Sequence, residues 1–367
     1  MKVLTIGSAT QDIFIHYKDP ESLVFRNRKE TRSYLLLEKG AKIDVETLSY
    51  STGGGATNSA VSFKKLGFDV ATFLKIGDGK AGQYVIDQLR EHSVDVRLIV
   101  RDKHFGTGLS YIIPSFEGDR TIFAYRGANA QLTLDEVPFK AIAQSDALYI
   151  TSLSGQSSQI FKPIVTYAKK YKIPVAVNPG VSQLCVGCQT LADALQNIDI
   201  FIVNSQEAKT FMLSLAPHLS PQELERDIAS SVKFEQLPAL VQSLVYIENI
   251  NFNLKDFCNG VLSRGPSIVV VTNGDEGVYV AHKKTLYFFP SLPAKVVDTV
   301  GAGDAFGSCF AAHLFKGSSL EDALIYGVIN ASSVISFEDA KSGLLTEREL
   351  KKRAAKVDRS LMKKFRL

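Results

Sequence analysis

The sequence predicts an α/β fold with a doubly wound, mostly parallel sheet and a small antiparallel β lid. Three observations lead to this prediction. Short apolar runs alternate with helical patterns along most of the chain, which is typical of parallel strands joined by crossover helices. Two β-rich stretches, at about residues 14–51 and 107–126, lack such helices and would form the lid. No internal repeat or low-complexity linker divides the 367 residues, so we expect a single domain over residues 1–367.

The strands expected in the main sheet are short apolar segments, and the helices between them have apolar residues at helical spacing. The expected strands cover residues 3–6, 70–75, 147–150, 175–177, 200–203 and 268–271. The expected helices cover residues 56–66, 81–91, 158–171 and 205–213. In the second β-rich stretch, Glu117, Gly118 and Asp119 predict the turn of a hairpin. A small sheet that stands off the main domain would suit a lid over a site that must exclude water.

The composition is that of an ordinary globular protein, with 45% hydrophobic and 22% charged residues. The net charge of +4, from 42 basic and 38 acidic residues, is too balanced to predict a nucleic-acid partner. No apolar run reaches the roughly 20 residues that span a bilayer, and residues 1–7 read as a strand rather than a secretory signal. We therefore expect a cytoplasmic protein with no membrane partner. Cys185 and Cys188 have the spacing of half a zinc site or of a redox pair, but no His lies nearby, which favours two reduced thiols.

The most informative segment is residues 297–307, a glycine-containing loop that runs into an amphipathic helix expected at 302–316. Gly301 and Gly303 allow backbone conformations in which successive N–H groups converge at the positive end of that helix. Asp304 follows, on a face whose small residues would let another molecule approach. An anion cradle beside a carboxylate is what phosphoryl transfer to an alcohol requires. The alternative is a common linker with an acidic residue that only offsets the helix dipole.

A second glycine-rich segment, Gly53 to Gly55 followed by Asn58, precedes an expected helix. It is not a dinucleotide fingerprint, because Asn58 stands where the third glycine would be, and the first strand lacks that fingerprint too. The segment therefore argues against a Rossmann-type oxidoreductase. Its glycines would let the backbone approach a ligand, to which the Asn58 amide offers a donor and an acceptor. A plain loop with an Asn near the helix start is the alternative.

Two further segments have both a structural and a functional interpretation. Asn204 and Glu207 form a capping-box pattern at a strand-to-helix junction, but at the carboxyl edge of the sheet the same pair could hold a hydrated Mg²⁺. The segment from Thr272 to Gly277 contains Asn-Gly, a good hairpin turn between two strands. The same turn could offer its Thr and its backbone to a nucleotide. The residues alone leave both alternatives open.

Four segments resemble, in their residues and in their order, the motifs of the ribokinase-like (PfkB-type) carbohydrate kinases. They are Gly-Gly-Gly-Ala-Thr-Asn, Asn-Ser-Gln-Glu, Thr-Asn-Gly-Asp-Glu-Gly and Asp-Thr-Val-Gly-Ala-Gly-Asp. The resemblance covers almost the whole chain, and its most specific element is residues 298–304. It implies a ribokinase-like fold, with ATP and Mg²⁺ as cofactors and a monovalent cation near Asp298. It also implies a homodimer formed through the lid.

The resemblance assigns roles to individual residues as well. Asp304 matches the catalytic base, and Gly301, Ala302 and Gly303 match the anion hole. Glu207 matches the residue that organises Mg²⁺ through water. The residues that match acceptor-binding positions are Asp12, Gly54, Gly55 and Asn58. The residues that match nucleotide-binding positions are Asn204, Thr272, Gly274, Gly277 and Asn330.

We therefore expect an ATP-dependent kinase that phosphorylates a hydroxyl group of a small sugar. A nucleoside kinase of the same fold is one alternative, and Phe14, Phe25 or Tyr34 could then stack on the base. A non-catalytic sugar sensor is another, although the intact catalytic motif argues against it. A phosphosugar acceptor would need a further cation, which Arg120 or Arg126 in the lid could supply.

Two features depart from the family pattern. Gly55 stands where ribokinases themselves carry Lys, which puts ribose in doubt as the substrate. The stretch between the Asn-Ser-Gln-Glu and Thr-Asn-Gly-Asp-Glu-Gly segments is long for the family. We expect an atypical helical insertion there, at about residues 215–255.

Overall fold

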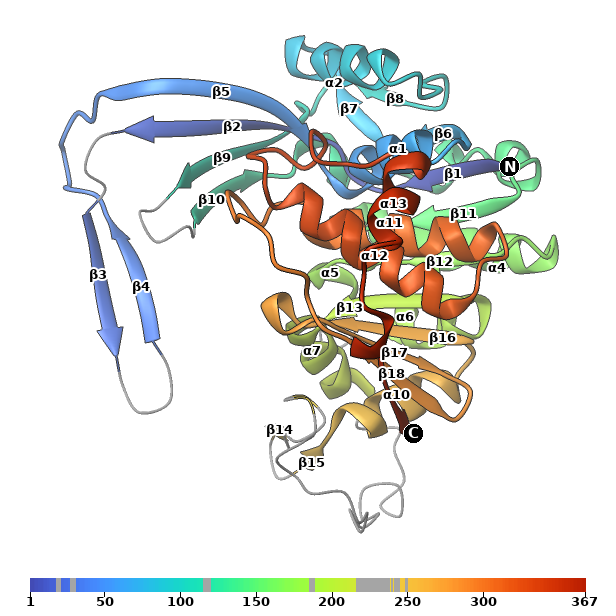
Figure 1. Cartoon of the computed structure of the whole chain (residues 1–367). Coiled ribbons are helices and arrows are strands. Elements are labelled where there is room, and N and C mark those ends of the chain that lie inside the picture. Colours follow the sequence, from blue (N-terminus) through green and yellow to red (C-terminus); the bar gives the residue numbers. More distant parts are fainter. Residues whose placement is uncertain are drawn as a thin grey trace.

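The structure is a computed structural model of the chain (Figure 1). It describes residues 1–17, 21–26, 31–114, 120–184, 189–215, 238, 240, 245–247 and 250–367. The chain folds into a main α/β body and a lid sheet that extends away from one edge of this body. In the described part of the chain, no helix is both long and apolar enough to cross a membrane.

The main sheet has nine strands in the described residues, in the order β19-β18-β17-β16-β13-β12-β11-β1-β6. Its parallel strands, all predicted, are β1 (Lys2–Ile6), β6 (Asp69–Phe73), β11 (Ala147–Ile150), β12 (Val175–Val177), β13 (Ile200–Asn204) and β16 (Ile268–Thr272). The antiparallel strands that extend one edge are β17 (Val278–His282), β18 (Thr285–Phe289) and β19 (Lys363–Arg366). Only the turn into the first of these three was predicted.

Helices cover both faces of the main sheet, which confirms the doubly wound fold (Figure 1). On one face lie α1 (Gly55–Lys65), α2 (Lys80–Glu91), α11 (Ala302–Phe315), α12 (Leu320–Val334) and α13 (Glu347–Ala354). On the other lie α3 (Phe139–Ala143), α4 (Phe161–Lys170), α5 (Val181–Leu184), α6 (Gln189–Ala194), α7 (Ser205–Leu215) and α10 (Leu254–Leu262). Successive residues of β1 point to opposite faces, so Val3 packs in the first core and Leu4 in the second.

The helix α11 is not amphipathic as the sequence predicted, because protein surrounds it on all sides. Its residues from Ala305 to His313 are buried. The hydroxyl groups of Ser308 and of Ser62 in α1 are hydrogen-bonded at 2.7 Å, and Gly307 leaves room for the hydroxyl of Tyr149 on β11. Gly307 and Ser308 therefore accommodate neighbouring elements of the fold rather than a ligand.

The lid is a sheet of four strands in the described residues, in the order β10-β9-β2-β5. They are β10 (Arg120–Tyr125), β9 (Gly108–Pro114), β2 (Thr10–Tyr17) and β5 (Val45–Gly53). The pairs β9–β10 and β2–β5 are antiparallel as predicted, but β2 and β9 run parallel. This parallel pair arises because both strands leave the main body and run outward, with Thr10 opposite Gly108 at its base. The predicted turn at Glu117, Gly118 and Asp119 lies outside the described residues.

Several elements lie apart from the two sheets. A hairpin of β3 (Glu21–Arg26) and β4 (Thr31–Leu36) continues from the far end of the lid (Figure 1). The short strands β7 (Lys75–Gly77) and β8 (Val100–Asp102) pair beside α2.

Most of the predicted helical insertion at 215–255 lies outside the described residues, but β14 (Val245–Ile247) and β15 (Ile250–Phe252) form an antiparallel pair there. In these two segments the structure has strands where we expected helix, whereas α10 (Leu254–Leu262) begins within the expected range. Cys185 and Cys188 also lie outside the described residues.

Candidate active site

A cavity of about 440 Å³ lies between the lid and the carboxyl edge of the main sheet. Its walls come from the lid strands β2, β9 and β10, from the loops after β1, β11 and β12, and from the first turns of α1, α7 and α11. Ligands of open α/β sheets bind at this edge because successive loops diverge there. The predicted residues that line the cavity are Asp12, Gly54, Gly55, Asn58, Glu207, Gly301 and Asp304. We call this cavity the cleft.

Asp304 and Asn58 form a direct hydrogen bond at the base of the cleft. The Asn58 side-chain N–H donates to Oδ2 of Asp304 at 2.8 Å. Burial raises the pKa of Asp304, while the hydrogen bond from Asn58 and the positive charge of Lys341 oppose this rise. A carboxylate whose pKa is raised accepts a proton more readily, so Asp304 has the chemistry of a general base.

The carbonyl oxygen of the Asn58 side chain is buried and has no hydrogen-bond partner among the described residues. A buried acceptor without a partner costs free energy, which a donor on a bound molecule would recover. Because the other end of the same amide holds Asp304, a hydroxyl group bound here would be close to the base. The geometry thus links ligand binding to the position of Asp304.

The loop before α11 places the backbone N–H groups that the sequence predicted as an anion site. Gly301 is the N-cap of α11 and has a φ of 77°, a left-handed conformation that favours glycine. A side chain at Gly301 would also collide with Ala340, whereas a Cβ at Gly303 would meet no atom within 4 Å. The first N–H groups of a helix have no acceptor within the helix. An anion could therefore approach the start of α11 from the Gly303 side.

Asp12 lies on the lid strand β2 and not on a strand of the main sheet. The Thr10 hydroxyl donates to its Oδ1 at 2.8 Å. Burial raises the pKa of Asp12, and hydrogen bonds from Thr10 and Ser110 oppose that rise. Strand alternation puts Thr10 and Asp12 on the same face of the lid, which is the face toward the cleft. Sequence reasoning missed both Thr10 and Ser110. The period of two along β2 marks Thr10, whereas Ser110 reaches Asp12 because β9 pairs with β2.

Lys341 is a buried cation near the cleft that no sequence motif marks. Its ammonium group donates to the backbone oxygen of Thr52 and, at 2.9 Å, to the Thr52 hydroxyl. Burial lowers its pKa to about 8, against the opposing attraction of the carboxylates of Asp12, Asp339 and Asp304. Lys341 thus joins the loop after α12 to the base of the lid strand β5. Its positive charge also acts on the carboxylates of Asp12 and Asp304 in the cleft.

Asn204 and Glu207 form the capping box that the sequence pattern indicated. The backbone N–H of Asn204 donates to Glu207 and the backbone N–H of Glu207 donates to the Asn204 side chain, both at 2.8 Å. This is a reciprocal capping box at the start of α7. Glu207 nevertheless also lines the cleft, and both burial and the negative charge of Asp304 raise its pKa. Two carboxylates therefore repel each other across the cleft.

The remaining predicted nucleotide residues lie beyond the lining of the cleft. Thr272, Gly274 and Gly277 belong to the turn between the antiparallel strands β16 and β17, which confirms the predicted turn. Asn330 is buried, donates to the backbone oxygen of Ala305 and accepts from the backbone N–H of Leu345, each at 3.0 Å. A contact from Asn330 to a nucleotide would require these bonds to open. The assignment of these four residues to nucleotide binding stays a prediction.

The aromatic residues that could have stacked on a base do not line the cleft. Phe14 is buried in the lid. Phe25 and Tyr34 pack edge to face on the β3–β4 hairpin, with ring centroids 5.7 Å apart. Among the described residues, none of the cleft lining is aromatic.

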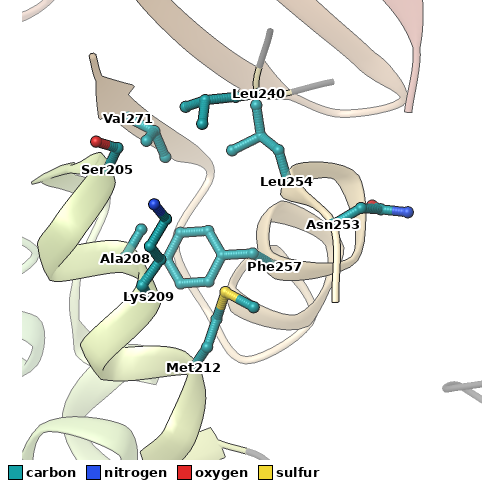
Figure 2. Close-up of a pocket in the computed structure, with 9 residues that line it drawn as sticks. All are labelled: Ser205, Ala208, Lys209, Met212, Leu240, Asn253, Leu254, Phe257 and Val271. Carbon is teal, nitrogen blue, oxygen red and sulfur yellow. The ribbon is translucent and has the colours of Figure 1, made fainter. Parts of the chain in front are cut away.

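A second pocket lies between α7 and α10, next to the end of β16 (Figure 2). Figure 2 shows Met212, Leu254 and Phe257 converging on it, with the Lys209 chain alongside. This lining is mostly apolar and contains no carboxylate, so it lacks the groups that acid–base chemistry needs. This pocket is therefore a weaker candidate for catalysis than the cleft.

Known proteins match the chain in both sequence and structure. A model of the pfkB family of carbohydrate kinases matches residues 23–234 and 239–347. The ribokinase of Staphylococcus aureus is 24% identical over 313 residues, which cover 84% of this chain and 90% of that protein. The Arabidopsis thaliana ribokinase complexed with ribose and ATP has a TM-score of 0.71 at 18% identity, covering 96% of this chain and 98% of that one. The nucleoside kinase of Methanocaldococcus jannaschii has a TM-score of 0.71 at 18% identity, covering 97% of this chain and 98% of that one. At these identities, the structural matches establish the fold.

The pKa of Lys341 predicts how stability depends on pH. Between pH 8 and its usual pKa of 10.5, the unfolded chain holds a proton that folded Lys341 has released, so stability should rise with pH in this window. Relative to Lys341→Met, the free energy of unfolding of the wild type should increase by about 2 kcal/mol between pH 7.5 and 10. Urea unfolding at both pH values measures this change. The exposed Lys352→Met is the matched control, and an identical pH dependence in wild type and Lys341→Met would contradict the assignment.

Proposed function

This chain belongs to the pfkB family of carbohydrate kinases, and from that premise we propose that it transfers the γ-phosphoryl group of ATP to a hydroxyl group of a free sugar. The observation that carries the proposal is the hydrogen bond between Asn58 and Asp304 at the start of α11. It brings a base, an unpaired acceptor and the positive end of a helix together in one polar cleft.

In the proposed reaction, Asp304 accepts the proton of the sugar hydroxyl as its oxygen attacks the γ-phosphorus. The bond from the γ-phosphorus to the bridging oxygen of ADP breaks on the opposite side, and ADP leaves. The backbone N–H groups of Gly301, Ala302 and Gly303 stabilise the negative charge on the transferring group. The raised pKa of Asp304 favours this proton transfer near neutral pH.

The lining of the cleft favours a free sugar as the acceptor. Asp12, held by Thr10, and the free carbonyl oxygen of Asn58 offer acceptors for neighbouring hydroxyl groups. No aromatic side chain is available among the described lining residues to stack on a base, which weighs against a nucleoside. Arg126 lines the cleft, so a phosphosugar remains the second candidate, whereas Arg120 is already paired with Asp298.

Glu207 suits a role in binding Mg²⁺. Its carboxylate faces Asp304 across the cleft, and a divalent cation would relieve the repulsion that raises its pKa. Mg²⁺ keeps several waters and takes few protein ligands, so Glu207 can hold the hydrated ion without a dedicated cage of carboxylates. When bound, the ion neutralises charge on the phosphates of ATP. In this proposal Glu207 holds the hydrated ion and Asn204 only orients Glu207 through the capping box.

ATP would extend from the cleft toward the β16–β17 turn with Thr272, Gly274 and Gly277. The Arabidopsis ribokinase of the same fold is a complex with ribose and ATP, which supports ATP as the donor. Because ATP is the proposed donor, we propose that the protein acts in the cytoplasm. A monovalent cation beside Asp298 does not fit, because the Arg120 guanidinium already lies 2.8 Å from that carboxylate.

The exposed apolar side chains of the lid support a homodimer formed through this sheet. Leu48, Tyr50, Phe123 and Tyr125 are all about half exposed on β5 and β10. Exposed apolar patches of this kind mark protein contacts. A second copy of the lid would cover them.

A panel of free sugars, nucleosides and phosphosugars tests the proposed function in an assay that couples ADP release to NADH oxidation. We expect ATP-dependent turnover with at least one free sugar and a kcat/KM at least about tenfold lower for every nucleoside and phosphosugar. Turnover with nucleosides alone, or with phosphosugars alone, would contradict the choice of acceptor.

The hydrogen bonds of Asp12 give a prediction for substrate affinity. Asp12→Asn removes the charge that would bind the sugar hydroxyls, so the KM for the sugar should rise roughly 10- to 100-fold while the KM for ATP stays unchanged. Steady-state kinetics with each substrate varied in turn measures this difference. Asp69→Asn, an exposed carboxyl group on β6, is the control. Lost ATP affinity with intact sugar affinity would show that the two halves of the site are reversed.

A further inference from the structure

An ion pair joins the lid to the loop that forms the anion hole. Arg120, the first residue of β10, donates to Oδ1 of Asp298 at 2.8 Å and to the Thr299 hydroxyl at 3.0 Å. The two charged side chains are only 19% and 13% exposed. Partly buried pairs with short contacts are stronger than solvated surface pairs, because water screens them less. This pair is therefore a specific connection between two distant parts of the chain.

Asp298 itself fixes the loop before α11. Its Oδ1 also accepts a hydrogen bond of 2.7 Å from the backbone N–H of Val300. The backbone N–H groups of Val297 and Asp298 donate to the backbone oxygen of Ile335, at 2.8 and 3.3 Å. Val300 directly precedes Gly301, so the carboxylate of Asp298 sets the path of the chain into the anion hole.

Arg120 lies on the face of the lid that covers the cleft. Alternate residues of a strand share a face, so Arg120, Ile122 and Ala124 point the same way. Ile122 and Ala124 line the cleft. The guanidinium that reaches Asp298 and these two side chains that line the cleft thus belong to one strand.

We propose that Arg120 is a positioning residue that supplies the positive charge at Asp298, so that lid closure and formation of the anion hole are a single event and no monovalent cation is needed. The role in catalysis rests on the proposed function, whereas the connection itself does not. A K⁺ ion at the same carboxylate would be repelled by a guanidinium only a few ångströms away. The disagreement with the cation that the family resemblance implies thus has a structural cause.

The first test varies the salt at constant ionic strength with the wild-type enzyme. Replacing KCl by tetramethylammonium chloride should change kcat/KM by less than about twofold, because no bound ion is lost from Asp298. Stimulation by KCl of about tenfold or more would overturn the proposal.

The second test removes the guanidinium. Arg120→Ala should lower kcat by about 10- to 100-fold through misplacement of the anion hole, and added guanidinium or K⁺ should restore part of this loss. Arg97→Ala removes an exposed Arg–Asp pair whose residues do not line the cleft, and should leave kcat unchanged. Arg120→Lys retains the charge and should lie between Arg120→Ala and the wild type. Wild-type kcat in Arg120→Ala would contradict the proposal.

Hydrogen exchange separates this proposal from the proposed function, because it needs no substrate. In Arg120→Ala, amide exchange should accelerate both in β10 and in residues 300–304, and remain unchanged in β1 and β11. The lid keeps other ties, since Glu338 contacts His16 at 2.9 Å and Lys341 still bonds Thr52, so the variant should fold. Acceleration confined to β10 would mean that the lid and the anion hole are independent. If the wild-type protein were inactive on the whole substrate panel but Arg120→Ala showed the expected exchange pattern, the proposed function would be rejected and the connection between lid and anion hole would stand.

Discussion

The hydrogen bond from Asn58 to Asp304 is the contact on which the rest of the site depends, because it joins the two helices that form the cleft floor. The helices α1 and α11 pack against each other and begin at the same edge of the sheet, as the bond between Ser62 and Ser308 one turn further along also shows. Their positive ends therefore meet in the cleft together with that of α7. This arrangement favours negative charge at the point where two carboxylates, Asp304 and Glu207, already face each other.

Local sequence patterns predicted the parts of the fold that short segments determine. Apolar runs located the parallel strands, and turn residues located the connection between β16 and β17. The glycines were informative because their roles depend on the backbone itself. Gly301 needs a left-handed conformation, and Gly54, with a φ of 95°, packs its backbone against Ser8 after β1. Gly54, Gly55, Asn58, Glu207, Gly301 and Asp304 were found because each belongs to a motif at the end of a strand or the start of a helix, whereas Asp12 lies within the lid strand β2.

Local sequence patterns could not predict contacts between segments that are distant in the sequence. Nothing near Lys341 in the sequence indicates that it will be buried against Thr52, and nothing near Arg120 indicates a partner at Asp298. The direction of β2 relative to β9 depends on where both strands leave the body, which a period of two cannot reveal. The helix α11 looked amphipathic because its small residues resemble an open face, but α1 packs against them. In each case the missing information was which elements become neighbours.

The central claim is that Asp304 is the base, and Asp304→Asn tests it most directly. The substitution keeps the shape of the side chain and removes its ability to accept a proton. We expect kcat to fall by about 10²- to 10⁴-fold while calorimetry shows ATP and sugar affinities close to those of the wild type. Turnover near the wild-type value, with both ligands bound normally, would contradict the account.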